Sequence, residues 1–153
     1  MPGATEAFTA AGTTIGMSAV LPASLSASAY AALTYTDIGE ITDGGSIGRT
    51  YNMVNHLPLS KRGVVKLKGS FDDGTMTIQA AFAPGDAGQV LIETAIDDDA
   101  FYAFEIELQD GTKIYFQAQV SSAPVNIGTA DAVVGTTFNV SVKSGTIIRV
   151  LPA

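Results

Sequence analysis

Apolar and polar side chains alternate over residues 101–120, which predicts a tight β-hairpin with one apolar face. That face carries Tyr102, Phe104, Ile106, Leu108, Ile114, Phe116, Ala118 and Val120. A two-residue turn at Asp110-Gly111 would set Leu108 opposite Lys113 and mix the two faces. A three-residue turn over residues 109–111, with Gly111 in the left-handed conformation, keeps the faces separate, and we therefore expect this longer turn.

The second face of this hairpin is predicted to be fully polar. The longer turn pairs Ile106 with Ile114, Phe104 with Phe116, Glu107 with Lys113 and Glu105 with Tyr115. A polar face on a strand pair of this length needs an explanation, because it leaves a carboxylate-bearing surface outside the core.

A short helix is predicted just before the hairpin. Asp86 has the character of an N-cap, with Gln89 as its capping-box partner. The predicted inward face consists of Ala87, Val90, Leu91, Thr94 and Ala95.

A second hairpin is predicted over residues 65–82, where apolar and polar residues alternate on both sides of Asp73-Gly74. A two-residue type I′ turn pairs Phe71 with Met76 and keeps the apolar face continuous. Further strands are expected near residues 15–19, 35–41, 138–142 and 146–150, with a single helical turn near 30–33. About eight strands and one helix predict a mainly β fold: a β-sandwich or rolled barrel with one flanking α-helix.

The chain organisation is expected to be simple. Residues 1–11 are small, polar and aperiodic and predict an N-terminal arm, and residues 12–153 predict a single domain. Residues 43–63 show no period of a strand or helix and predict a long loop. Apolar residues such as Tyr51, Met53 and Leu59 on a long loop indicate docking onto another molecule, although folding back onto its own domain would also bury them.

Charge changes this picture more than composition does. The 153 residues carry a net charge of −7 and include no cysteine, which argues against ordinary nucleic-acid binding and against a disulfide framework. No apolar run reaches membrane-span length, and residues 1–18 lack the basic start of a signal peptide. Five of the eight basic residues lie within residues 49–68, and ten of the fifteen acidic residues lie within 72–110. This segregation favours pairing between copies of the chain, with a solvated surface as the alternative.

No catalytic set assembles from the sequence. His56 is the one histidine, the glycine-rich residues 44–49 lack a phosphate-loop pattern, and Asp97-Asp98-Asp99 lack the spacing of a calcium loop. Glu105 and Glu107 share a strand face but have no apolar pocket to raise a pKa. We therefore expect no enzyme activity, no metal and no cofactor.

Several motifs in order resemble the lambda-like tail tube (major tail) proteins of phages with long non-contractile tails. They are Pro84-Gly85-Asp86-Ala87-Gly88-Gln89, Ala103-Phe104-Glu105-Ile106, Asp110-Gly111-Thr112, Phe116-Gln117-Ala118-Gln119-Val120-Ser121-Ser122, Asp37-Ile38-Gly39-Glu40-Ile41 and Lys68-Gly69-Ser70. The resemblance covers roughly residues 35–150, and it rests on the order and spacing of the motifs.

The resemblance implies a structural protein of the virion, made in the host cytoplasm. Subunits form hexameric rings that stack head to tail around a tape-measure protein, with tail terminator and tail-tip proteins as further partners. DNA passes through the lumen without specific binding during ejection, and no membrane is involved. The N-terminal arm and the long loop are expected to reach the neighbouring ring.

The resemblance also assigns roles to residues. It places Arg49, Tyr51, His56, Leu57, Lys61 and Arg62 on an inter-ring loop, Glu105, Glu107, Gln117 and Gln119 on the lumen face, and Asp86, Gln89 and Glu93 on an inter-subunit helix. The alternatives are a soluble β-sandwich module that binds carbohydrate or protein, and the tube of another injection machine or gene-transfer particle.

Overall fold

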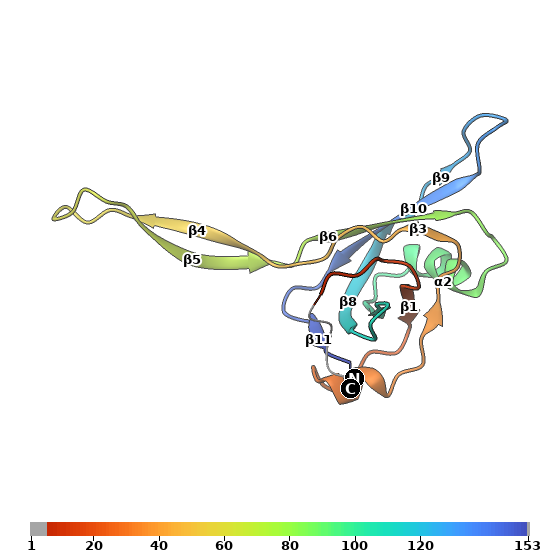
Figure 1. Ribbon diagram of the computed structural model, residues 1–153, viewed down its shortest axis with the longest axis horizontal. Coiled ribbons are helices and arrows are strands. Elements are labelled where there is room, and N and C mark those ends of the chain that lie inside the picture. The colour runs from red at the N-terminus through yellow and green to blue at the C-terminus, as the bar shows by residue number, and fades with distance from the viewer. Residues whose placement is uncertain (1–5, 153) are drawn as a thin grey trace.

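The chain folds into a curled antiparallel β-sheet with two helices and a separate two-stranded arm (Figure 1). The computed structural model describes residues 6–152, so part of the predicted N-terminal arm at residues 1–11 lies outside the described residues. The described elements are β1 (Thr14–Ser18), α1 (Ala27–Ala31), β2 (Thr36–Asp37), β3 (Ile41–Asp43), β4 (Thr50–His56), β5 (Val65–Asp72), β6 (Thr75–Ala81), α2 (Ala87–Ile96), β7 (Tyr102–Glu107), β8 (Lys113–Ser122), β9 (Val125–Asn126), β10 (Gly135–Val142) and β11 (Ile148–Val150).

The main sheet has the order β2-β1-β7-β8-β10-β6-β3, with β11 also paired to β8 and β9 to β10. The sheet curls into a half-barrel, which confirms the predicted mainly β fold with a flanking helix. The described residues form more and shorter strands than the eight predicted. Glu40 and Gly45, both with positive φ, interrupt the strands in this part of the chain.

The central hairpin, β7–β8, has the predicted register. Ile106 lies opposite Ile114 and Glu107 opposite Lys113. Gly111 has φ 93° in the turn, and the Leu108 amide donates to the Thr112 carbonyl at 2.9 Å. The apolar pattern alone therefore determined this turn, since only the three-residue form keeps the core face intact.

The predicted hairpin over residues 65–82 is wrong. β5 does not pair with β6 but with β4, and β6 pairs with β3 and β10. Residues 41–81 thus form one long hairpin: its base belongs to the main sheet, and its distal part leaves the body as β4–β5. Asp73-Gly74 is a corner where the strand continues from the arm into the sheet, and the left-handed Gly74 makes that corner possible at φ 76°.

The predicted loop at residues 43–63 is also wrong, because residues 50–56 are a regular strand. Apart from the half-buried Tyr51, both faces of this strand are solvent-exposed in the subunit, so it carries no contrast between a buried and an exposed face. A strand with this burial pattern leaves no period-two signal in the sequence.

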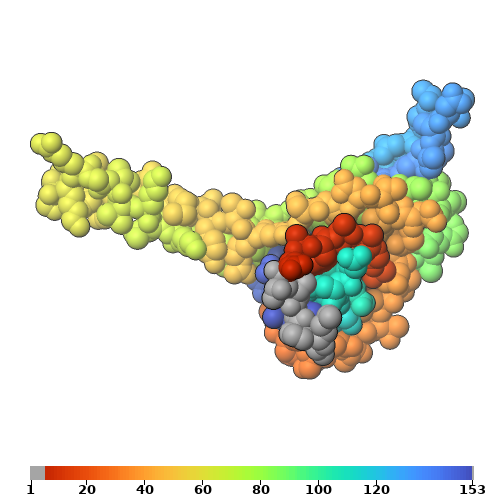
Figure 2. Space-filling model, viewed as in Figure 1, coloured from red at the N-terminus to blue at the C-terminus, as the bar shows by residue number. Residues whose placement is uncertain are grey.

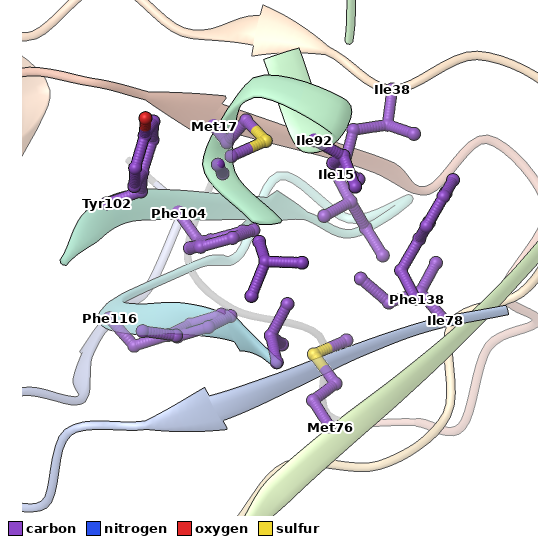
Figure 3. Close-up of a cluster of buried hydrophobic side chains, with 14 of the residues drawn as sticks. Ile15, Met17, Ile38, Met76, Ile78, Ile92, Tyr102, Phe104, Phe116 and Phe138 are labelled. Carbon is purple, nitrogen blue, oxygen red and sulfur yellow. The ribbon is translucent and has the colours of Figure 1, made fainter. Parts of the chain in front are cut away.

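The core lies between the concave side of the sheet and α2. Figure 3 shows Ile92 of α2 pointing toward Met17 and Ile15 of β1, with the rings of Phe104 and Phe116 below. These two rings stack with centroids 5.1 Å apart. α2 begins at the predicted N-cap, Asp86, whose side chain accepts from the Gln89 amide at 3.1 Å.

The predicted inward face of α2 is wrong apart from Ala95, which is buried, and Leu91, which packs half-buried against the core. The buried residues are Gly88, Gln89, Ile92 and Ala95, whereas Val90 is exposed. Gly88 explains the difference: a Cβ at this position would overlap the Asp37 carbonyl oxygen and the Ile38 Cα. The helix therefore presents its bare backbone to the β2–β3 connection, a contact that hydrophobicity alone does not predict.

Gly88→Ala is expected to lower the free energy of unfolding by about 2 kcal/mol, because the added methyl meets backbone and not a movable side chain. Gly85→Ala is the matched control, since a Cβ there meets nothing within 4 Å. Urea denaturation of both variants tests this, and equal stabilities would contradict the close approach.

The outer face of the β7–β8 hairpin is not fully polar as predicted. Tyr30 of α1 stacks on Tyr115 with centroids 5.2 Å apart, and Tyr35 lies 6.1 Å from the same ring. Ala103 and Tyr115 are buried beneath them in a second small cluster. Burial and the carboxylate of Glu105 raise the pKa of Tyr115 to about 12, so this ring stays neutral. The helical turn expected near residues 30–33 lies at Ala27–Ala31, and this helix covers the face.

Candidate functional site: assembly surfaces

The β4–β5 arm projects from the body and has almost no contact with it beyond its root (Figure 2). Apart from Tyr51, which is half-buried, its strand residues are exposed on both faces. An isolated two-stranded hairpin is marginally stable in water, and its free edges are templates for pairing. The arm is therefore a surface that gains stability from a partner.

The two faces of the arm differ in chemistry. Val54 lies opposite Leu67, and His56 lies opposite Val65, which makes one face largely apolar. Met53 lies opposite Lys68, and Asn55 lies opposite Lys66, which makes the other face basic. We name these the apolar face (Val54, His56, Val65, Leu67) and the basic face (Tyr51, Met53, Asn55, Lys66, Lys68, Phe71) of the arm.

Asp73 fixes the root of the arm to the body. Its buried carboxylate accepts from Arg49 Nε at 2.9 Å and from the Gly145 amide at 2.8 Å, and its own amide donates to Ser144 Oγ. Burial raises the pKa of Asp73, but the Arg49 guanidinium and the Gly145 amide outweigh burial and hold that pKa below its ordinary value.

Stacked cations and rings continue from this ion pair along the arm. The Arg49 guanidinium lies 3.9 Å from the centre of the Phe71 ring, and Phe71 packs against Tyr51 at 5.5 Å. Lys68 Nζ in turn lies 4.8 Å from the Tyr51 ring centre. Arg49 and Tyr51, predicted for inter-ring contact, thus lie at the root and set the direction of the arm.

The other predicted inter-ring residues lie further out. His56 ends β4, and Leu57, Lys61 and Arg62 lie in the exposed connection at the tip. Residues 49–71 carry five basic and no acidic side chains, and all fifteen acidic residues lie elsewhere in the chain. The segregated charges of the sequence are therefore separated in space as a basic arm and an acidic body.

The predicted helix residues divide into two groups. Asp86 accepts from the Gly39 amide at 3.0 Å, and the Gln89 side chain donates to the carbonyls of Gly39 and Ala81 and accepts from the Ala83 amide. Gln89 is buried. These two side chains therefore join the helix to its own sheet, and only Glu93 of the three is exposed for contact with another subunit.

The predicted lumen residues all lie on the outer face of the sheet. Gln117 is only 6% exposed, because α1 and its neighbours cover this part of the face. Glu105, Glu107 and Gln119 are half-buried. Gln119 Nε2 donates to the Asp99 carbonyl.

Beyond Gln119 the outward residues of β6 and β10 carry no charge, and the nearest carboxylate, on the exposed Asp43 of β3, lies opposite Gln79. The outward residues of β6 and β10 there are Thr75, Thr77, Gln79, Thr137, Asn139 and Ser141. Thr77 donates to Asn139 Oδ1 at 2.9 Å, and Ser121 donates to the Asn139 carbonyl at 2.9 Å. We name these six residues the amide–hydroxyl face. The alternation over residues 75–81 and 137–142 is the signal for this face in the sequence.

A second projection was missed by sequence reasoning. β9 and the start of β10 form a short hairpin, residues 124–137, that leaves the body at the end away from the arm (Figure 1). Its apolar tip residues Ile127 and Val133 are 71% and 80% exposed. No regular alternation marks this hairpin in the sequence, because β9 has two residues only.

A cavity of about 380 Å³ is lined mainly by aliphatic residues of several strands, among them Ile15, Ile41 and Ile106. In the described part of the chain, no three metal-ligating side chains cluster. Neither helix within residues 6–152 has the length and apolar character needed to cross a membrane.

No family model and no curated protein matches the sequence. Solved structures do match. One chain of the anti-feeding prophage baseplate has a TM-score of 0.70 at 11% identity, covering 96% of this chain and 97% of the other. A chain from the tail of an empty gene transfer agent particle has 0.67 at 11% identity, covering 96% and 100%. The SPP1 tail tube has 0.61 at 15% identity, covering 90% and 75%.

The chain has the fold of a tail tube subunit. At these identities the similarity is one of fold, and it extends over nearly all of the chain. On this fold the chain carries three exposed features: the basic arm, the amide–hydroxyl face and the apolar hairpin at the other end.

Proposed function

We propose that this protein is a structural subunit of a phage tail tube and assembles with copies of itself. The observation that carries the proposal is the arm: an exposed ribbon with an apolar face, held at a fixed angle by Asp73, on a body with the tail-tube fold. A basic arm and an acidic body favour heterologous contacts, which generate open filaments and not closed dimers.

The assembly we propose is a stack of hexameric rings, joined head to tail by the arms and surrounding a tape-measure protein, with terminator and tip proteins at the ends. Six-fold symmetry is stated for the gene transfer agent tail and the anti-feeding prophage baseplate, which supports the ring size. These similar structures are parts of assemblies, and they support a structural role over an enzymatic one. The tube would belong to the virion and conduct DNA during ejection.

Purification and electron microscopy of the chain test this function. We expect rings or tubes with a central channel, whose formation weakens at high salt because arm and body carry opposite charges. A monodisperse monomer at every protein and salt concentration would overturn the proposal. The alternative of a carbohydrate-binding module is less supported, because the aromatic rings of Tyr30, Phe104 and Phe116 are buried and not arranged along a groove.

We further propose that the lumen wall includes the amide–hydroxyl face together with Gln119. Uncharged side chains offer phosphate no ion pair, so DNA can slide without release of bound counterions. Glu105 and Glu107 would add negative charge at the edge of this wall. Gln117 is left out of the proposal because the subunit itself covers it.

The addition of positive charge tests the lumen wall. Gln79→Lys combined with Thr77→Lys is expected to give tubes that retain duplex DNA in a salt-dependent manner, because each added cation pairs with phosphate. The matched control is Val90→Lys with Thr94→Lys, which adds the same two charges at exposed positions of α2. The measurement is the amount of duplex DNA retained by tubes of each variant. Equal retention by the two variants would contradict an inward position for Gln79.

A further inference from the structure

The hairpin over residues 124–137 has no structural role within its own subunit that explains its apolar tip. Its pairing is limited to Gly135 with Asn126 and Thr136 with Val125, and the tip beyond these pairs is exposed. Ile127 and Val133 are among the most exposed large apolar residues described. An apolar projection of this kind marks an interaction surface.

Position and charge indicate what covers this tip. The hairpin and the arm leave the body at opposite ends of the molecule (Figure 1), and Figure 2 shows both projecting free of the surface. Each copy thus carries one apolar projection at each end, which is the arrangement for a contact that repeats along a filament. Residues 124–137 contain one charged side chain, Asp131, and no basic one, so they do not repel the five basic residues of the arm.

We propose that the tip of this hairpin in one copy packs against the apolar face of the arm of another copy. This inference rests on the proposed tube assembly and adds the specific contact. Val54, Val65 and Leu67 of the arm and Ile127 and Val133 of the hairpin would be removed from water together. The basic face of the arm then stays turned toward the acidic body or solvent.

Disulfide trapping tests the contact directly, because the natural chain has no cysteine. A chain carrying both Leu67→Cys and Val133→Cys is assembled and then oxidised. We expect a ladder of covalent oligomers on a non-reducing gel, since each copy links to the next. The control chain carries Lys66→Cys with Val133→Cys, which places the arm thiol on the basic face of the ribbon.

The outcomes separate the contact from the assembly. A ladder from the Leu67 variant and none from the Lys66 variant supports the contact. Tubes that form but yield no ladder, or equal ladders from both variants, overturn it and leave the tube function intact. If the natural chain forms neither rings nor tubes by electron microscopy, the proposed function falls and this inference falls with it.

Discussion

A chain in which residues 52–70 are replaced by a two-residue turn is expected to remain folded and to lose tube formation. The deletion keeps the root pair Tyr51 and Phe71 and removes both strands of the arm at once. The removed residues are exposed, so the core loses no packing and the melting temperature should change little. Circular dichroism melting and sedimentation of the assembled fraction measure the two effects.

The size of the assembly defect follows from the buried area that is lost. Full burial of a Val or Leu side chain contributes about 1.5–3 kcal/mol, and the arm's apolar side chains are already partly covered in the subunit. Three such residues at about 1 kcal/mol each would change the association constant by roughly a hundredfold per contact. In a stacked assembly, this loss of affinity raises the protein concentration at which tubes form by a similar factor.

A point variant provides the control for this deletion. Lys66→Ser changes the basic face and leaves the apolar face intact, so tubes should still form, with weaker salt dependence. If the deleted chain assembles as readily as the natural chain, the arm does not join subunits.

Asp73→Asn is expected to destabilise the subunit by about 2 kcal/mol, which corresponds to a fall in melting temperature of roughly 4–8 °C for a chain of this size. The buried carboxylate accepts from Arg49 and Gly145, and a neutral amide satisfies these donors poorly. The arm root should loosen as well, so assembly weakens. Asp72→Asn is the matched control, because Asp72 is exposed and accepts only the neighbouring Gly74 amide.

The effect of Asp73 depends on pH in a defined direction. Its pKa in the folded state is lower than the 3.8 expected for an unperturbed carboxyl. The stabilisation is therefore fully present above the unfolded pKa and is lost as pH falls through the folded pKa. The stability difference between the natural chain and Asp73→Asn should shrink below about pH 4. A difference that stays constant from neutral pH down to acid unfolding would show that Asp73 is not ionised in the fold.

The elements that could be predicted from the sequence are those in which one face is buried and the other is exposed. The β7–β8 hairpin has a core face, so its register and even its turn type could be read from Leu108 and Thr112. β4 has no buried face, and nothing in the alternation of Tyr51, Met53 and Asn55 distinguishes it from a loop. The apolar residues in this aperiodic segment still predict contact with another molecule, and that role stays a prediction.

Two predictions were wrong because the same sequence pattern occurs in more than one kind of structure. Asp73-Gly74 between alternating runs is typical of a hairpin turn, but the same left-handed glycine serves a corner between consecutive strands. Only the distant residues Arg49, Ser144 and Gly145 distinguish the two, since they bury Asp73. The polar face of β7–β8 was likewise covered by Tyr30, which lies far away in sequence.

A cryo-electron microscopy map of the assembled chain tests the central claim most directly. The account predicts a hollow tube of stacked rings in which each arm bridges to the next ring and Gln79 and Asn139 face the channel. A tube in which the arms point into solvent, or in which α2 lines the channel, would contradict it.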